Sequence, residues 1–518
     1  MKDEAKKTVL KIGKPGEAIQ PGAFQNRMDI ECADIADGVT EIGRLAFAGC
    51  NSLKTVSIPG SVATIKPAAF DGCGSLRSVA MAEGVRKIAG WAFSDCTSLE
   101  SVDIPGSVRS IGCWAFSGCT SLKSVILPAG VRSIESCAFA GCTSLESIVI
   151  PASVAEIAPS AFDDCPRLAK IGYAGPAFRV EGGAMLSGDG TKLLRWMGWF
   201  PAYSRAAELP SPVTKVGPGA FAGSGALETV RLPEGVTAIG DGAFMNCASL
   251  KSLHIPGSVT AIGDAAFKGC SSLESVTIPP GVASIGGRTF CGCGSLRSVA
   301  LPESVEEIGE RAFEGCASLE SLAIPAGVTK ICASAFDDCF RLAGIGYGGQ
   351  AYRFVGGAML SGDGKTLLRW LPAFGGKAVV PAGVKKIATK AFHGSMGVTE
   401  VQLPEGLEEI GMSAFANCPL ESVAIPGSVK KIGESAFRCC PFLKSAVLPE
   451  GVAEIGEEAF YGCVSLEAAG IPRSAGKIGA KAFGNCPKLV RARVPAGRKA
   501  AKTSLFPGCG ALEEMVEF

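Results

Sequence analysis

The sequence contains very little histidine, few tyrosines and tryptophans, and no excess of charge of either sign. Only His254 and His393 occur among 518 residues, so a histidine-based catalytic triad, a multi-histidine zinc site or a histidine proton relay has almost no residues to draw on. Lysine plus arginine (50) and aspartate plus glutamate (49) nearly cancel. That balance argues against a nucleic-acid-binding or polybasic membrane-surface protein, but it leaves a local cationic patch open.

Long apolar runs are also missing. No stretch approaches the ~18 uninterrupted apolar residues of a membrane-spanning helix. Residues 1–20 have no apolar core of the kind that a secretory signal peptide needs, which leaves intracellular residence, another export route or a missing leader as alternatives. Disorder is excluded, because 47% of the residues are hydrophobic and only 19% are charged.

Glycine (68) and phenylalanine (26) are abundant, because a short motif is repeated along the chain. A phenylalanine, usually after alanine, recurs nineteen times at intervals of 23 residues, with one interval of 22 and two longer gaps. The shared pattern is AFxxCxxLxxVxIPxxVxxIGxx, which marks a repeat architecture. The phenylalanines are Phe24, Phe47, Phe70, Phe93, Phe116, Phe139, Phe162, Phe221, Phe244, Phe267, Phe290, Phe313, Phe336, Phe392, Phe415, Phe437, Phe460, Phe483 and Phe506.

The residues of one repeat predict its local structure. Val276-Thr277-Ile278 alternates apolar and polar side chains and ends at Pro279, as a half-buried strand does. Val282 to Ile285 predicts a second short extended piece, and the next AFxxC segment predicts a helical turn that buries Phe290. One such coil cannot bury its apolar residues alone, so we expect coils to stack on a shared core.

The repeat pattern AFxxCxxLxxVxIPxxVxxIGxx resembles that of the BspA-like, treponemal-type leucine-rich repeat family, over residues 12 to 514. The resemblance implies a repeat solenoid, here a leucine-rich repeat array of about nineteen 23-residue β-strand/helical-turn units with two hairpin insertions. It also implies a surface adhesin of a host-associated microbe that recognises matrix proteins or other cells. Localisation stays open, because neither a signal peptide nor an anchor motif is visible in the sequence.

Two insertions interrupt the repeats and copy each other, since residues 161–196 match residues 335–370 at an offset of 174. Each predicts a β-hairpin, which in the first copy turns at Gly188-Asp189-Gly190. The alternative is a cation-binding loop to which Asp163 and Asp164 contribute. A calcium site needs several oxygen ligands, and the turn itself supplies one carboxylate. We expect a single domain, 1–518, with repeat blocks at 12–170, 211–344 and 381–518 and hairpin inserts at 171–210 and 345–380.

Sixteen of the 22 cysteines stand three residues after a repeat phenylalanine. We expect a buried column of free thiols that bond the backbone, because parallel side chains in adjacent coils have poor disulfide geometry and cannot enclose zinc. The remaining six are Cys32, Cys113, Cys137, Cys291, Cys332 and Cys439. Of these, Cys113 and Cys137 are the best placed to meet, and no CxxC motif occurs.

Three rows of side chains are candidates for contact with a partner. The residue after each repeat leucine is charged, with signs that largely alternate from Lys54 to Glu146 and from Glu228 to Glu320; it predicts a self-neutralising ladder or a docking strip. The outward strand positions vary from Ser57 to Ala323 and include His254. Such variation fits either a binding face or drift.

Tryptophan marks the third row. Trp91 and Trp114 stand two residues before the phenylalanine of consecutive coils, so we expect them to stack side by side as a binding site. Both inserts keep a tryptophan, Trp196 and Trp370, which we expect to pack the hairpin on the solenoid. Trp199 and Tyr203 belong to one insert only and are further candidates for contact with a partner.

No catalytic motif is present: the sequence has no GxSxG with a histidine partner, no HExxH, no Walker motif and no dinucleotide fingerprint. The leading hypothesis is a non-catalytic protein- or glycan-binding scaffold, adhesin-like and at a microbial cell surface. The alternative is an intracellular protein-interaction scaffold, and a hydrolase with a site at the inserts is remote. We expect no cofactor, no metal ion, no nucleic acid partner and no membrane span.

Overall fold

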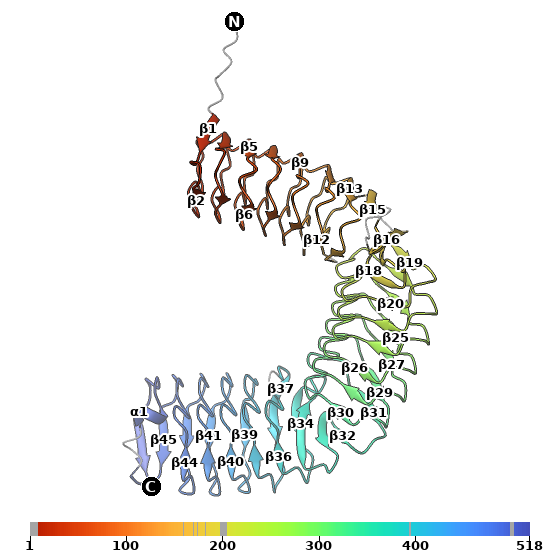
Figure 1. Cartoon of the computed structure of the whole chain (residues 1–518). Coiled ribbons are helices and arrows are strands. Elements are labelled where there is room, and N and C mark those ends of the chain that lie inside the picture. The colour runs from red at the N-terminus through yellow and green to blue at the C-terminus, as the bar shows by residue number, and fades with distance from the viewer. Residues whose placement is uncertain are drawn as a thin grey trace. The chain divides into compact units, whose positions relative to one another are not determined.

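The computed structural model describes residues 9–158, 160–168, 170–173, 175–181, 183–196, 205–392, 395–497 and 502–518. The chain divides into two compact units, Met1–Val236 and Thr237–Phe518. In each unit, coils stack so that longer strands form one parallel row and two-residue strands form another (Figure 1). That all 518 residues form one array stays a prediction.

The strands of the first unit alternate between the two rows. The longer strands are β1 Val9–Ile12, β3 Cys32–Ile35, β5 Thr55–Ile58, β7 Ser78–Met81, β9 Ser101–Asp103, β11 Ser124–Ile126, β13 Ser147–Ile150, β15 Lys170–Tyr173, β19 Ala206–Glu208 and β21 Thr229–Arg231. The two-residue strands are β2 Ala18–Ile19, β4 Glu41–Ile42, β6 Thr64–Ile65, β8 Lys87–Ile88, β10 Ser110–Ile111, β12 Ser133–Ile134, β14 Glu156–Ile157 and β20 Lys215–Val216.

The second unit repeats this arrangement. Its longer strands are β23 Ser252–His254, β25 Ser275–Thr277, β27 Ser298–Ala300, β29 Ser321–Ile324, β31 Gly344–Tyr347, β35 Gly376–Val379, β37 Val398–Gln402, β39 Ser422–Ala424, β41 Ser445–Val447, β43 Ala468–Gly470, β45 Arg491–Val494 and β46 Glu514–Glu517. Its two-residue strands are β22 Ala238–Ile239, β24 Ala261–Ile262, β26 Ser284–Ile285, β28 Glu307–Ile308, β30 Lys330–Ile331, β36 Lys386–Ile387, β38 Glu409–Ile410, β40 Lys431–Ile432, β42 Glu454–Ile455 and β44 Lys477–Ile478.

The predicted strands of the repeat are confirmed. In β25 the middle residue, Val276, is buried while Ser275 and Thr277 are exposed, and β26 buries Ile285. Each strand pairs in parallel with the strand of the next coil, as Ile65 does with Ile88 at a distance of one repeat along the chain. The alternation of apolar and polar residues therefore sets one face of each strand toward the shared core.

The predicted helical turn at AFxxC is wrong in detail, because the segment is a run of tight turns. The residue two before phenylalanine has a positive φ, +57° at Leu45, which an α-helix cannot contain. The N–H of Phe47 donates to the carbonyl oxygen of Ala69 in the next coil at 2.7 Å, not back along its own coil. Within the described residues the one α-helix is α1, Lys502–Leu505.

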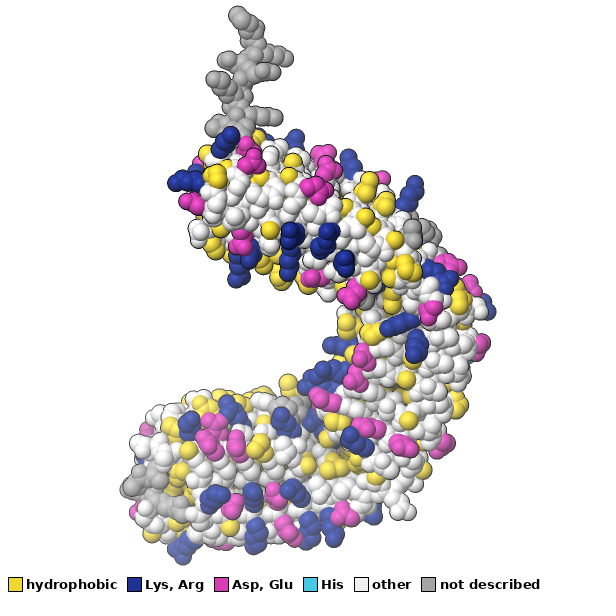
Figure 2. All heavy atoms as spheres, viewed as in Figure 1, with side chains coloured by type: hydrophobic (Ala, Val, Ile, Leu, Met, Phe, Trp, Pro, Cys, Tyr) yellow, Lys and Arg dark blue, Asp and Glu magenta, His cyan; other side chains and the backbone are white. Residues whose placement is uncertain are grey.

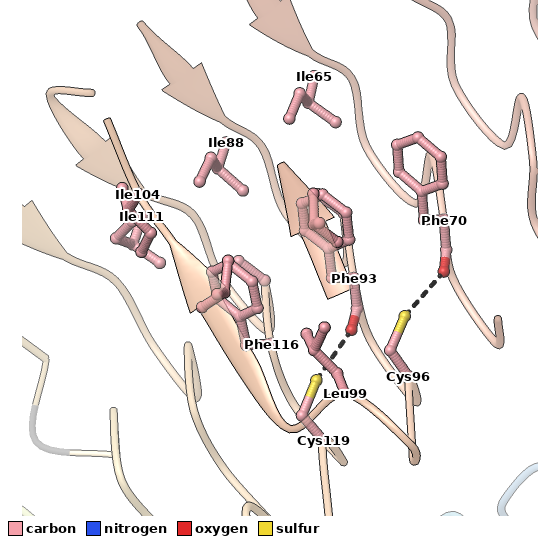
Figure 3. Close-up of a cluster of buried hydrophobic side chains, with 14 of the residues drawn as sticks. Ile65, Phe70, Ile88, Phe93, Cys96, Leu99, Ile104, Ile111, Phe116 and Cys119 are labelled. Atoms are coloured by element: carbon pink, nitrogen blue, oxygen red, sulfur yellow. Dashed lines mark hydrogen bonds between the residues drawn. The ribbon is translucent and has the colours of Figure 1, made fainter. Parts of the chain in front are cut away.

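The core is built from columns of identical residues. The rings of Phe70, Phe93 and Phe116 stack with centroids 5.1 and 5.4 Å apart, because each coil adds one ring per strand spacing of ~4.8 Å (Figure 3). The Cys96 thiol donates to the carbonyl oxygen of Phe70 at 3.3 Å, and Cys119 bonds Phe93 in the same way (Figure 3). The predicted column of buried cysteines bonded to the backbone is confirmed.

Each insert has one more strand than the predicted hairpin. In the first insert β16 Phe178–Glu181, β17 Ala184–Ser187 and β18 Lys192–Trp196 form an antiparallel meander, and in the second insert β32 Tyr352–Val355, β33 Ala358–Ser361 and β34 Thr366–Trp370 do the same. The last strand of each meander then pairs in parallel with the next two-residue strand, β20 or β36. Each insert is therefore a coil of the stack that carries an added hairpin.

Candidate functional site

Trp91 and Trp114 lie at the edge of two consecutive coils, with 48% and 40% of their surfaces exposed. Both have a left-handed backbone, with φ of +55° and +60°. The backbone N–H of each donates to a carbonyl oxygen of the next coil at 2.9 Å. The following Ala-Phe pairs are fully buried. A rigid backbone thus holds two indole rings toward solvent. That the two rings lie side by side as a binding site stays a prediction.

Left-handed geometry recurs at the same position in most coils, including Leu45, Ala68, Cys137 and Arg288. The conformation costs a non-glycine residue about 1–2 kcal/mol, so the stacked backbone hydrogen bonds must offset it. Its effect is to turn the side chain away from the buried phenylalanine. The position therefore accepts side chains of different size and charge, from alanine to arginine and tryptophan. Trp199 and Tyr203, the other two predicted contact residues, lie outside the described residues.

A second exposed surface lies on the outward positions of the longer strands. Ile126 and Val149 are paired residues of β11 and β13, with 71% and 47% of their surfaces exposed. Strands β1, β3, β5 and β7 border an open groove of about 530 Å³, whose lining includes Lys11, Asp34 and Asp37. In the second unit a smaller groove of about 340 Å³ lies over β37 and β39. His254 lies at the exposed end of β23.

Ion pairs join neighbouring coils in the predicted charge row. Lys54 lies 2.7 Å from Glu31, Arg205 lies 2.9 Å from Glu228, and Arg341 lies 3.6 Å from Glu320. In each pair at least one partner is more than half exposed, so the pair contributes roughly 0–1 kcal/mol. These ion pairs fit the self-neutralising ladder.

Two thiols inside the column, Cys73 and Cys119, are unreactive at neutral pH, whereas at its C-terminal end the bond with Cys486 lowers the pKa of Cys509 to about 7. Burial raises the pKa of Cys73 to about 12, and it raises that of Cys119 to about 12 as well. A thiol with such a pKa is not a nucleophile at neutral pH. The expected meeting of Cys113 and Cys137 is wrong, because the thiol and the N–H of Cys113 both donate to the carboxylate of Glu135, at 3.2 and 3.1 Å.

An arginine–aspartate clamp holds each insert, and sequence reasoning missed it. Arg195 of β18 donates to Asp163 at 2.7 Å and to the carbonyl oxygens of Gly219 and Ala222 at 2.6 and 2.9 Å, so it ties the insert to the coils before and after it. Arg369 and Asp337 repeat the pair at 2.7 Å in the second copy. Burial raises the pKa of Asp337 to about 6 against the opposing effect of Arg369. The sequence contains a signal for this clamp, because both copies of the insert keep the aspartate and the arginine.

The tryptophans of the inserts do pack on the solenoid, as predicted. The ring of Trp196 lies 5.7 Å from Phe221 and that of Trp370 lies 5.2 Å from Phe392, so both extend the phenylalanine stack. A signal for this placement was available, because Lys192-Leu193 stands one repeat before Lys215-Val216, with which it pairs. These two indoles are nearly fully buried and belong to the core.

The turn at Asp189 uses its carboxylate internally. One oxygen of Asp189 accepts hydrogen bonds from the hydroxyl of Ser187 and from the N–H and hydroxyl of Thr191, at 2.5, 3.0 and 2.9 Å. The Ser187 bond is the largest of the effects that lower the pKa of Asp189 to about 2. These bonds favour a plain hairpin turn. In the part of the chain that the structure describes, no three His, Cys, Asp or Glu side chains are grouped to hold a metal ion.

Chemically, these surfaces offer contact area, hydrogen bonds and charge. The carboxylates beside the inserts, Asp163 and Asp337, are engaged by arginine. His393 lies outside the described residues. Over the described residues we find no helix with the length and apolar character needed to cross a membrane.

The chain was compared with known families and proteins. The model of the BspA type leucine rich repeat region matches it in six copies, over residues 17–121, 92–177, 214–343 and 376–515. These ranges span the repeats and leave most of both inserts unmatched. A search of curated proteins found no significant match.

Solved structures of bacterial repeat proteins are similar to this chain. A leucine rich cell surface protein from Faecalibacterium prausnitzii is 29% identical, covers 66% of this chain and 95% of its own length, and superposes with a TM-score of 0.45. A leucine-rich repeat protein from Eubacterium ventriosum is 24% identical, with 64% and 90% covered and a TM-score of 0.46. The pneumococcal vaccine antigen PcpA is 19% identical, with 82% and 86% covered and a TM-score of 0.42.

Proposed function

The chain belongs to the BspA-type leucine-rich repeat family, and from that premise we propose that it is a non-catalytic binding scaffold with an adhesin-like role at a microbial cell surface. The observation that carries the proposal is the pair of indoles at Trp91 and Trp114. Exposed tryptophans concentrate binding energy, because they bring a large contact area at a small cost in conformational entropy. Here a stacked, hydrogen-bonded backbone holds both of them in place.

The apolar patch of Ile126 and Val149 supports the same function on a different side of the coil. Solvent-exposed strands ordinarily carry polar residues outward, and the other outward positions of the first unit include Ser57 and Asp103. Two paired, exposed, β-branched apolar residues therefore form a local surface that a protein partner would cover. The function we propose rests on the tryptophans, with this patch as an accessory contact.

The double substitution Trp91→Ala/Trp114→Ala tests the proposal. A panel of immobilised matrix proteins, cell-surface glycans and whole host cells is probed with the purified chain, and the variant is compared on every surface that retains the wild type. We expect binding to weaken at least about thirtyfold, because the loss of even one anchor aromatic costs on the order of 2 kcal/mol. The melting temperature should stay close to that of the wild type, since both indoles are exposed.

Phe340→Ala/Phe442→Ala is the matched control, because it removes two equally exposed aromatic rings from the second unit. The control should bind like the wild type. Unchanged affinity of the tryptophan variant, or equal losses in the two variants, would reject the tryptophan surface as the binding site.

A further inference from the structure

Three arginines stand at one position of three consecutive coils in the first unit. Arg86, Arg109 and Arg132 each come directly before or beside a two-residue strand, and all three are exposed. The N–H of Arg109 donates to the carbonyl oxygen of Arg86 at 2.9 Å, and that of Arg132 donates to Arg109 at 2.8 Å. The three backbones are thus hydrogen-bonded neighbours, and Lys87 of β8 lies next to them. We call these four residues the cationic row.

Nearby carboxylates form no ion pair with the cationic row, although Glu83 lies near Arg109: the hydrogen bond from Gly106 and, less strongly, the charge of Arg109 lower the pKa of Glu83. Glu83 accepts hydrogen bonds from the N–H groups of Gly106 and Ser107 at 2.7 and 2.9 Å, and Glu135 accepts them from the N–H and the thiol of Cys113. Glu156 of β14 lies one coil beyond Arg132. In the described part of the chain, no carboxylate oxygen comes within 4.0 Å of the four cationic groups. Lys and Arg side chains gather over the region between β6 and β12 (Figure 2).

The repeat itself does not demand this run of like charge. In the second unit the same position is held by Lys385, Glu408 and Lys430, whose signs alternate. There Lys385 pairs with Glu408 at 3.0 Å, and Lys386 pairs with Glu409 at 2.9 Å. Like charges on adjacent strands repel each other by up to about 1 kcal/mol in water. The cationic row therefore carries a cost to stability that its counterpart avoids.

The cationic row and the exposed tryptophans belong to the same coils, five residues apart along the chain. Trp91 follows Arg86 by five residues and Trp114 follows Arg109 by five, with only a two-residue strand and a turn between them. Because the coils are stacked, both rows run along the stacking direction. Arg109 uses one N–H on the carbonyl oxygen of Gly106 at 3.0 Å, which leaves its other donors available.

We propose that this surface binds a linear anionic polysaccharide, laid along the stacking direction, with its sulfate or uronate groups on the cationic row and its sugar rings on Trp91 and Trp114. The inference rests on the proposed function and specifies its ligand class. Guanidinium groups bind oxyanions through paired N–H donors, and the backbones that carry them repeat about every 4.8 Å, which suits a polymer that repeats its charge. Indole rings offer an apolar surface against which the less polar face of a sugar packs.

Calorimetric titration with a size-defined heparin oligosaccharide tests this inference. We expect the wild type to bind it more tightly than a desulfated, N-acetylated oligosaccharide, which keeps only its uronate charges. Arg86→Ala/Arg109→Ala should weaken binding about tenfold or more and flatten its dependence on salt, because two anion contacts are lost. Lys385→Ala/Lys386→Ala removes two cations from the equivalent position of the second unit, and its affinity should equal that of the wild type.

A second variant separates loss of binding from loss of folding. Arg109→Glu restores the alternation of sign, so it should unfold at the same temperature as the wild type or above it, while heparin binding is lost. The Trp91→Ala/Trp114→Ala variant should bind more weakly with the salt dependence retained.

Four results would overturn the inference: no binding of heparin by the wild type, equal losses in the two alanine pairs, full affinity in Arg109→Glu, or equal affinity for single-stranded DNA of matched charge. Equal affinity for DNA would show that binding depends on charge alone and that the sugar is not recognised. None of them removes the proposed function, because a protein ligand that depends on the tryptophans but not on the cationic row would remain detectable in the panel.

Discussion

At the scale of single residues, the recurring left-handed position decides what each coil shows to solvent. Glycine occupies it at Gly22, Gly219 and Gly242, and other coils place larger residues there at a positive φ. The sequence alone predicted the buried phenylalanine and the bonded cysteine, because these recur. The sequence alone did not predict the positive φ two residues before most of the repeat phenylalanines, since only a few glycines at that position indicate it.

Exchanging glycine and alanine at this position should change stability in opposite directions. Ala265 and Gly242 stand at equivalent positions of adjacent coils with φ of +53° and +56°. Ala265→Gly should raise the free energy of unfolding by about 1 kcal/mol, and Gly242→Ala should lower it by about as much, because only glycine adopts this conformation without strain. Chemical denaturation of both variants checks this. Two changes of the same sign would contradict the argument.

At the scale of elements, the inserts show what a repeat pattern can and cannot reveal. The turn at Asp189 and the strands on either side of it were predictable, because Gly-Asp-Gly between apolar segments favours a hairpin. The first strand of each meander was not recognised, since a hairpin with one turn was expected where the structure has three strands. The clamp was missed because Asp163 and Arg195 are 32 residues apart, and no local rule connects them.

The clamp of the second insert predicts a dependence of stability on pH. Burial raises the pKa of Asp337 from its unfolded value near 3.8 to about 6, so the folded state favours the protonated carboxyl. The resulting stabilisation is present at about pH 4 and is lost as the pH rises through about 6. Denaturation midpoints between pH 4 and 7 should fall more steeply for the wild type than for Asp337→Asn. Parallel pH profiles would show that this carboxyl does not titrate in that range.

At the scale of the whole molecule, regular contacts between neighbouring coils explain the composition. Excess glycine and phenylalanine fill repeated turn and core positions, and paired charges between coils keep the net charge at +1. The family and the fold follow directly from the sequence, because the repeat motif occurs many times along the chain. The binding surface does not follow in that way, because it lies where the coils differ, at Trp91, Trp114 and the cationic row.

An adhesin-like role predicts where the protein is found. Protease added to intact cells of the source microbe should remove the protein, because a surface location exposes the loops of its coils. A cytosolic protein probed in the same samples is the control and should survive. Complete protection until the cells are lysed would support the intracellular scaffold instead.

The central claim is that partners contact the coil edge that carries Trp91 and Trp114. Hydroxyl-radical footprinting measures this directly, since exposed indoles are oxidised and covered ones are protected. With a ligand from the panel bound, oxidation of Trp91 and Trp114 should fall severalfold while that of Phe340 and Phe442 stays constant. Unchanged oxidation of both tryptophans in the saturated complex would contradict the account.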